Sequence, residues 1–114
     1  MKLVITSPKP GTGIVAFPVK NLDAGNVKAF REAVLPVTNE NGTVLIDMSE
    51  LKFVDISGLG ALLACMRAMN SKNGRLRLFG MTKPVRALFE LVRMHRIFEI
   101  FDTLEEALDS PSET

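Results

Sequence analysis

The residues best placed to do chemistry lie in the segment FVDISGLG, which spans positions 53–60. A carboxylate, Asp55, precedes a hydroxyl, Ser57, by two residues, and Gly58 and Gly60 follow the hydroxyl. The segment stands between a short apolar run and a helical pattern of apolar residues, so it is predicted to join a buried strand to a helix. Ligands and partners of α/β proteins gather at the carboxyl ends of strands, and this junction is therefore the predicted site.

Ser57 has a structural and a functional interpretation, and the two are compatible. It stands where an N-cap is expected, so its hydroxyl would accept a hydrogen bond from a helix amide. The same hydroxyl would lie beside the unpaired N–H groups at the positive end of the helix, which could also meet a phosphate carried by Ser57. Gly58 and Gly60 would leave the start of the helix bare, so that the backbone of a partner can approach closely.

Asp55 also has two interpretations. It could hold the loop by local hydrogen bonds, as Asp does in turns. It could instead present an acidic contact to a partner. In either case it would orient the Ser57 hydroxyl before modification, or oppose a phosphate on Ser57 by charge repulsion.

Enzymatic interpretations find no support in the motifs. Gly58-Leu59-Gly60 is not the start of GxGxxG because position 63 is Leu, and no GxxxxGK[ST] string is present. Asp55, Ser57 and His95 do not form a recognisable triad because the chain has no GxSxG elbow. The single Cys, Cys65, falls within an apolar helical pattern and is predicted to be a core residue. We therefore predict a protein that is not an enzyme, with no catalytic residue, no metal site and no cofactor.

Length and composition limit the remaining possibilities. The chain has 114 residues, 46% of them hydrophobic and 24% charged, which fits one globular domain. One Cys excludes an intrachain disulfide and favours a reducing compartment, and no apolar run is long enough to cross a bilayer, so we expect a cytoplasmic protein without membrane insertion. The net charge of +1 argues against direct nucleic-acid binding.

The charge is nevertheless unevenly distributed along the chain. Residues 67–96 contain eight basic side chains and only one acidic one, Glu90, whereas the C-terminal segment after position 98 is acidic. Two interpretations remain open. Basic faces of two helices and a strand could lie near an acidic C-terminal helix, or they could form a surface for an anionic partner. The basic residues are Arg67, Lys72, Arg75, Arg77, Lys83, Arg86, Arg93 and Arg96, and the acidic ones are Glu99, Asp102, Glu105, Glu106, Asp109 and Glu113.

The apolar runs predict five strands. They lie at 3–7, 14–19, 43–49, 75–79 and 97–101, and the turn sequence PKPGTG between the first two predicts a hairpin. Later strands alternate with helical segments, which predicts parallel pairing through right-handed crossovers. The chain is therefore predicted to be one α/β domain over residues 1–110, a mixed β-sheet with a starting hairpin and about four helices, followed by a frayed tail at 111–114.

Four helices are predicted between these strands. Asp23 is expected to cap the first helix, which Pro36 should end or kink before a loop at 39–42. The second helix begins at Ser57 and closes at Asn73-Gly74. The third follows Thr82, and the fourth begins with a capping box formed by Thr103 and Glu106.

The segment DISGL, in this arrangement of elements, resembles the STAS domain of bacterial anti-sigma factor antagonists. The motif of that family runs apolar, Asp, Ser, Ser or Thr, Gly, Leu at a strand-to-helix junction, and its second hydroxyl residue is the phosphoacceptor. Asp55, Ser57, Gly58 and Leu59 match this motif, so the resemblance implies that Ser57 is the phosphorylation site. Ile56 departs from the motif, since the family often has Ser there. The likeness extends over nearly the whole chain, including VLIDMSELKFVDISGLGALL, RLRLFGMTKPV and TLEEAL in the family order.

The resemblance also implies partners. Unmodified, the protein would bind an anti-sigma factor with Ser/Thr protein kinase activity through residues 55–60 and so regulate sigma-factor-dependent transcription. The kinase would phosphorylate Ser57 and end the binding, and a PP2C-type phosphatase would restore it. STAS domains also occur in transport and sensing complexes. The alternative is therefore a constitutive STAS scaffold subunit, in which Ser57 is only a helix cap and the basic helices carry the contacts.

Overall fold

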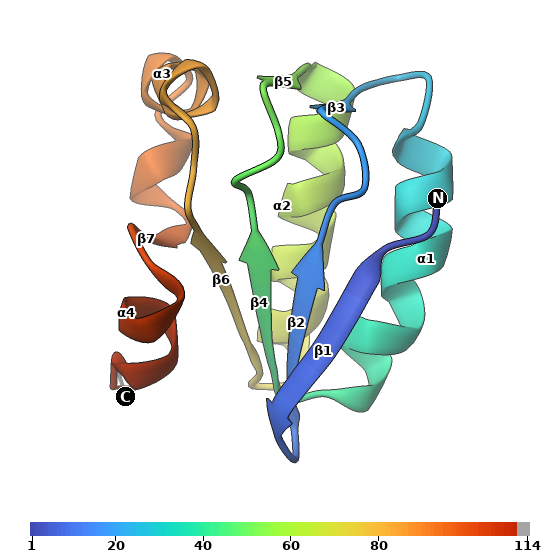
Figure 1. The fold of residues 1–114 in the computed structure, drawn as a ribbon, viewed down its shortest axis with the longest axis vertical. Coiled ribbons are helices and arrows are strands. Elements are labelled where there is room, and N and C mark those ends of the chain that lie inside the picture. Colours follow the sequence, from blue (N-terminus) through green and yellow to red (C-terminus); the bar gives the residue numbers. More distant parts are fainter. Residues whose placement is uncertain (112–114) are drawn as a thin grey trace.

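A mixed five-stranded sheet organises the chain in the computed structural model, which describes residues 1–111 (Figure 1). The strand order is β1-β2-β4-β6-β7; β1 pairs antiparallel with β2, and the other neighbours are parallel. The predicted hairpin and parallel strands are thus confirmed. Of the tail expected at 111–114, residues 112–114 lie outside the described part. The strands are β1 Val4–Lys9, β2 Thr12–Ala16, β4 Thr43–Asp47, β6 Arg75–Phe79 and β7 Glu99–Phe101.

The helices cover both faces of this sheet, because the side chains of each strand alternate between the faces. On one face Val44, Ile46 and Leu78 pack against α1, α2 and α3 in the larger apolar core. On the other face Leu45 and Phe79 pack against α4 in a smaller core. The helices are α1 Val27–Glu40, α2 Ile56–Ser71, α3 Lys83–Leu91 and α4 Leu104–Asp109, with a 3-10 turn, η1, at Met94–Arg96.

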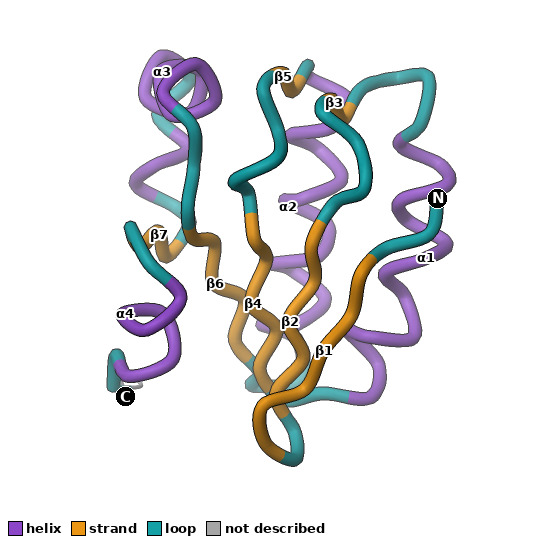
Figure 2. The backbone as a smooth tube through the Cα atoms, viewed as in Figure 1, coloured by secondary structure: helices purple, strands orange, loops and turns teal. Residues whose placement is uncertain are grey.

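A second, very small sheet was not predicted. Strands β3 (Asn21–Leu22) and β5 (Phe53–Val54) pair in parallel beside the start of α2 (Figure 2). Two residues are too few to show an alternating pattern in a sequence, so only the pairing across the fold reveals them. This small sheet brings the segment before α1 next to the segment before α2.

The first helix differs from its prediction at both ends. It begins at Val27 after Asn26, and Asp23 is not its N-cap. Pro36 lies inside the helix, which continues to Glu40, so residues 39 and 40 are helical rather than part of a loop. The apolar face of the helix explains why Pro36 does not end it, since Phe30, Val34 and Val37 on both sides of the proline are buried. The free energy gained by burying these side chains offsets the loss of the helix hydrogen bond that proline cannot donate.

Two strands are shorter than predicted. The strand expected at 43–49 ends at Asp47, and the strand expected at 97–101 begins at Glu99 because η1 occupies the preceding residues. The predicted close of α2 at Asn73-Gly74 is confirmed: the helix ends at Ser71, Asn73 has a φ of 60°, and the Gly74 amide donates to the Met69 carbonyl at 2.8 Å. The Thr103 cap is confirmed, since its side chain accepts a hydrogen bond from the Glu106 amide. Among residues 1–111 no helix is both long and apolar enough to cross a membrane.

Candidate functional site

The predicted site lies where β5 passes into α2. The pairing of β3 with β5 continues into the junction, because the amide of Asp55 donates to the carbonyl of Leu22 at 3.2 Å. The start of α2 therefore packs against backbone that comes from more than 30 residues earlier in the chain. This contact holds the site residues 55–60 on a surface formed by two loops rather than one.

Asp55, not Ser57, is the N-cap of α2. Its backbone is extended, and its Oδ1 accepts a hydrogen bond from the Gly58 amide at 2.9 Å. The prediction that Ser57 occupies the cap is therefore wrong. Asp caps helices as well as Ser does, and an Asp two residues earlier moves the helix start to Ile56.

The second oxygen of the Asp55 carboxylate binds the loop before α1. Its Oδ2 accepts from the Ala24 amide at 3.1 Å. That loop is itself held by polar contacts, since Asp23 accepts from the Gly25 amide and from the Asn21 side chain. The geometry thus favours the structural interpretation of Asp55, in which its hydrogen bonds shape the loop.

Ser57 lies half-buried in the first turn of α2. Within residues 1–111 its hydroxyl forms no hydrogen bond, and the amides of Ile56 and Ser57 have no acceptor. An unbonded hydroxyl beside unpaired N–H groups at a helix N-terminus is chemically able to accept a phosphoryl group and to have that group stabilised.

The two glycines of the motif have different neighbours. A Cβ at Gly58 would lie 2.4 Å from the Leu22 carbonyl oxygen, so this glycine permits the close approach of the chain's own β3. A Cβ at Gly60 would meet nothing within 4 Å. The bare surface expected from both glycines is therefore present at Gly60, while Gly58 and Leu59 are buried.

Two large apolar side chains flank the junction on its outer side. Ile56 is 72% exposed and Phe53 is 55% exposed. Sequence reasoning included Ile56 in the site but missed Phe53, although the alternation of Phe53 with buried Val54 gives a signal for its outward direction. The Leu22 and Ala24 backbone groups were also missed, and no local pattern could have indicated them.

The remaining candidate groups for chemistry are accounted for by the fold. Cys65 is buried, as predicted, and desolvation raises the pKa of its thiol to about 11, against a smaller opposing effect of Arg31. His95 is exposed in η1, and its Nδ1 lies 3.5 Å from the Phe89 carbonyl oxygen. In the described part of the chain no three His, Cys, Asp or Glu residues gather as metal ligands would.

The basic and acidic segments are in contact, as one of the two interpretations of the charge pattern predicted. Arg75 and Arg77 both pair with Glu99, at 2.7 and 3.0 Å, and Arg86 pairs with Asp102 at 3.2 Å. Glu113 of the predicted acidic group lies outside the described residues. Part of the basic charge is thus matched within the domain.

Several known proteins are similar to this chain in sequence. An anti-sigma-B factor antagonist of Listeria monocytogenes is 29% identical over 85 residues, which are 74% of this chain and 75% of the Listeria protein. The relatives with comparable matches include a putative anti-sigma factor antagonist of Thermotoga maritima, 24% identical over 98 residues, 84% of this chain and 87% of that protein.

Solved structures extend the likeness to the whole fold. The anti-sigma factor antagonist SpoIIAA of Bacillus matches with a TM-score of 0.78 in its unphosphorylated form and 0.72 in its phosphorylated form, at 24% identity in both. Each match covers 94% of this chain, and 93% and 96% of the respective SpoIIAA chains. The murine anion transporter Slc26a9 matches with a TM-score of 0.76 at 22% identity, over 90% of this chain but only 18% of the transporter.

These structural likenesses show the fold, and the family follows from the sequence. The STAS domain model matches residues 5–107, which include α1, α2, α3 and all of the two sheets except the first residue of β1. The chain therefore belongs to the STAS domain family.

Proposed function

We propose that this protein is an anti-sigma factor antagonist whose partner binding is switched by phosphorylation of Ser57. The observation that carries the proposal is the Ser57 hydroxyl, which is left without a hydrogen bond in the described chain because Asp55 already caps α2. A serine that the helix does not need, at a motif position shared with anti-sigma factor antagonists, supports a role outside the fold. The Listeria and Thermotoga relatives support the partner class.

The partner would dock on the junction formed by residues 55–60. Ile56 and Gly60 present the outer surface of this segment, while Gly58 and Leu59 maintain its shape from inside. The partners are an anti-sigma factor with Ser/Thr protein kinase activity and a PP2C-type phosphatase. The protein itself acts by binding, in the cytoplasm, without catalysis and without direct contact to nucleic acid.

The physical effect of the switch is electrostatic. A phosphate on Ser57 adds about −1.5 to −2 charges at neutral pH. In the free protein the amides of Ile56 and Ser57, which have no acceptor among residues 1–111, and the surrounding water would stabilise that charge, against the repulsion of Asp55. At a docked interface the water is removed, and a partner without a matching cation loses affinity by about tenfold for each 1.4 kcal/mol of penalty.

This mechanism needs no change of fold. The SpoIIAA structures support that point by analogy, since its unphosphorylated and phosphorylated forms both match the present fold. The modification would act where the partner touches the protein.

The experiment is a pull-down from lysate of the native host with the wild type, Ser57→Ala and Ser57→Asp variants in parallel. We expect wild type and Ser57→Ala to retain an anti-sigma factor, and Ser57→Asp to lose it. Incubation of the retained kinase with ATP should label wild type and leave Ser57→Ala unlabelled. Equal retention by all three variants would contradict the switch.

A constitutive scaffold subunit is the second candidate. The observation that favours it is the match to Slc26a9, in which the STAS fold forms 18% of a transporter chain. In that case the protein purified from its host would carry no phosphate on Ser57, and Ser57→Asp would bind its complex as the wild type does. Mass spectrometry of the native protein separates the two candidates.

A further inference from the structure

An apolar groove runs along the surface between α1 and α2. The two helices lie side by side on one face of the large sheet and run in the same direction (Figure 1). The groove between them has a volume of about 180 Å³, and its walls extend from Arg31 to Thr38 on α1 and from Ala61 to Ala68 on α2. The role proposed for Ser57 does not use this groove.

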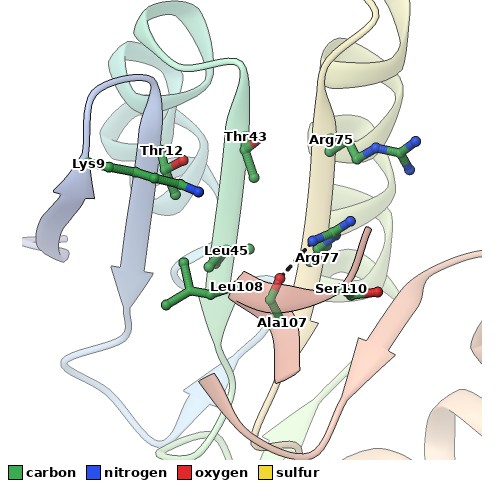
Figure 3. A pocket seen from close by; sticks show the side chains of 9 residues that line it. All are labelled: Lys9, Thr12, Thr43, Leu45, Arg75, Arg77, Ala107, Leu108 and Ser110. Carbon is green, nitrogen blue, oxygen red and sulfur yellow. Dashed lines mark hydrogen bonds between the residues drawn. The ribbon is translucent and has the colours of Figure 1, made fainter. Parts of the chain in front are cut away.

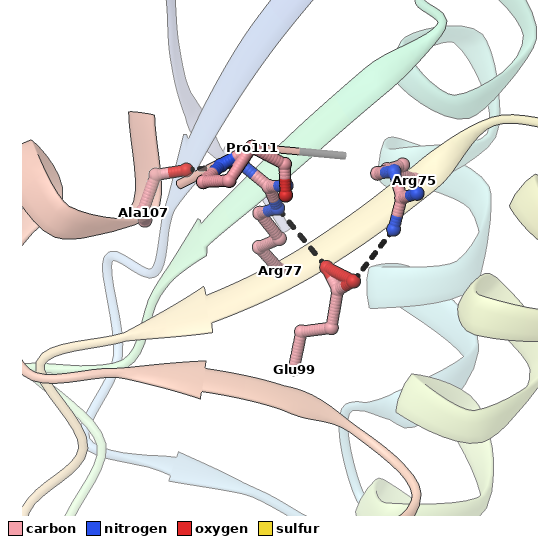
Figure 4. A network of polar contacts seen from close by, with 5 residues as sticks. All are labelled: Arg75, Arg77, Glu99, Ala107 and Pro111. Atoms are coloured by element: carbon pink, nitrogen blue, oxygen red, sulfur yellow. Dashed lines mark hydrogen bonds and ion pairs between the residues drawn. The ribbon is translucent and has the colours of Figure 1, made fainter. Parts of the chain in front are cut away.

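The cavity beside α4 shows the contrast. It has a similar volume, about 190 Å³, but polar walls that include Lys9 and Arg77 (Figure 3). The Arg77 guanidinium donates there to Glu99 and to the Ala107 and Pro111 carbonyls, at 3.0, 2.7 and 3.3 Å (Figure 4). Contacts within the fold therefore account for this buried cation, and no ligand is needed to explain it.

The walls of the groove between α1 and α2 consist mainly of apolar side chains. On α1, Leu35 is 55% exposed although it is a large aliphatic residue, and Val34 lies buried beside it. On α2, the small side chains of Ala61, Ala64 and Ala68 leave the space open. An apolar group that enters this space removes exposed apolar surface from water, which favours binding.

Two polar side chains also line the groove, and neither adds charge. The Thr38 hydroxyl donates to the Leu35 carbonyl at 3.0 Å. Cys65 keeps its proton at neutral pH because burial raises the pKa of its thiol to about 11, against a smaller lowering by Arg31. The interior of the groove is therefore uncharged.

Arg31 is the one charged residue that lines the groove in the described chain, and it stands at one end. It is exposed, and its side chain forms no ion pair or hydrogen bond within residues 1–111. At the other end the ammonium of Lys72 donates to the Thr38 carbonyl, so that cation is already engaged. The groove thus complements a ligand with an apolar body and an anionic head.

The dimensions of the groove select the thickness of that body. Each wall extends over two turns of helix, about 10 Å. The volume of about 180 Å³ over this length gives a groove about 4 Å across. Packed carbon atoms lie about 4 Å apart, whereas a helix with its side chains is about 10–12 Å across and does not fit. An extended alkyl chain of about eight carbons matches both the length and the width.

We propose that the groove between α1 and α2 binds a medium-chain fatty acid, with the alkyl chain against Leu35 and the alanines of α2 and the carboxylate at Arg31. The apolar walls, the width of a single chain and the one cation define this class of ligand. The site is separate from residues 55–60, so its test is independent of the switch proposed at Ser57.

The test is an NMR titration of the full chain with sodium octanoate, with hexanoate and decanoate as a length series and 1-octanol as the uncharged match. We expect saturable shifts of the methyl groups of Leu35, Ala64 and Ala68, with the methyl groups of Ile56 unchanged. Each CH₂ added from hexanoate to octanoate should strengthen binding by about fourfold. Decanoate should gain little more, because its chain exceeds the length of the groove.

Matched variants place the ligand in the groove. Ala64→Leu fills the groove from an exposed helix position and should weaken octanoate binding by at least about tenfold. Ala87→Leu, at an exposed alanine of α3, should leave the affinity unchanged. Arg31→Gln should weaken octanoate binding by about two- to fivefold and leave 1-octanol binding unchanged, because an exposed ion pair contributes little. Arg96→Gln, at an exposed arginine of η1, is the control for net charge.

The absence of saturable methyl shifts in the groove overturns the proposal, as does undiminished octanoate binding by Ala64→Leu. Equal effects of Arg31→Gln and Arg96→Gln would overturn the assignment of the carboxylate, because only net charge would then matter. Sedimentation velocity tests a second copy of the chain as the occupant: a wild-type dimer that Leu35→Lys dissociates would also overturn the proposal. Arg31 is exposed, so Arg31→Gln decides the question even if Ala64→Leu disturbs the packing of the helices.

Discussion

The carboxylate of Asp55 accepts a hydrogen bond from the backbone amide of Ala24, 31 residues earlier in the chain, at 3.1 Å. Its other oxygen caps α2 through the Gly58 amide. One side chain thus connects the loop before α1 to the start of the helix that carries Ser57. Removal of this side chain should therefore destabilise both the loop before α1 and the start of α2.

Replacement of Asp55 separates its structural role from any role of its charge. Asp55→Ala removes the cap and the bond to Ala24, so we expect the free energy of unfolding to fall by about 1–3 kcal/mol. Asp55→Asn retains a capping oxygen and should lose less. Urea titration measures both changes. If Asp55→Asn is nearly as stable as wild type yet binds the partner poorly, the charge of Asp55 is itself a contact to the partner. Wild-type stability of Asp55→Ala would contradict the structural role of the two Asp55 hydrogen bonds.

Ser57 should tolerate substitution with little effect on the fold. Its hydroxyl makes no hydrogen bond among residues 1–111, and Ala favours helices, so Ser57→Ala should change stability by less than about 0.5 kcal/mol. Ser57→Asp adds a charge near the positive end of α2 but also near Asp55, and should stay within about 1 kcal/mol of wild type. Thermal melting of both variants checks this. A large loss in Ser57→Ala would show that the hydroxyl supports the helix after all.

The two glycines of α2 form a matched pair for testing the approach of β3. Gly58→Ala would place a Cβ against the Leu22 carbonyl and should destabilise the fold by about 1–3 kcal/mol. Gly60→Ala meets open space in a helix and should raise stability by about 0.5–1 kcal/mol. Chemical denaturation of the two variants should therefore give shifts of opposite sign. A stabilising effect of Gly58→Ala would mean that β3 moves away easily.

Because of Cys65, the free energy of unfolding should depend on pH in the alkaline range. Burial raises the pKa of its thiol from 9.0 to about 11, so the folded state holds the proton more tightly than the unfolded state. The resulting stabilisation is complete below pH 9.0 and is lost as the pH rises toward about 11. Denaturation of wild type and Cys65→Ala across this range measures it, and the fall with pH should be smaller in the variant. Rapid labelling of the native thiol at neutral pH would contradict the burial.

The sequence determined the class of the fold through patterns that repeat within single elements. The alternation in RLRLF, the helical spacing after Ser57 and the turn sequence between β1 and β2 each specify a local structure that survives in the fold. The order of these elements then limits the sheet to parallel pairing after the hairpin. The position of the site at a strand-to-helix junction follows from the same local signals.

Only the tertiary structure decided the roles within that site. Asp55 and Ser57 are both acceptable caps, and the sequence cannot rank them because the choice depends on where the helix starts against β3. The need for glycine at position 58 arises from the Leu22 carbonyl, and the second bond of Asp55 from the Ala24 amide. The continuation of α1 through Pro36 likewise depends on burial against the rest of the core. Local sequence patterns indicate the conformational preference of each residue. Contacts between segments that are distant in the sequence form only when the chain folds.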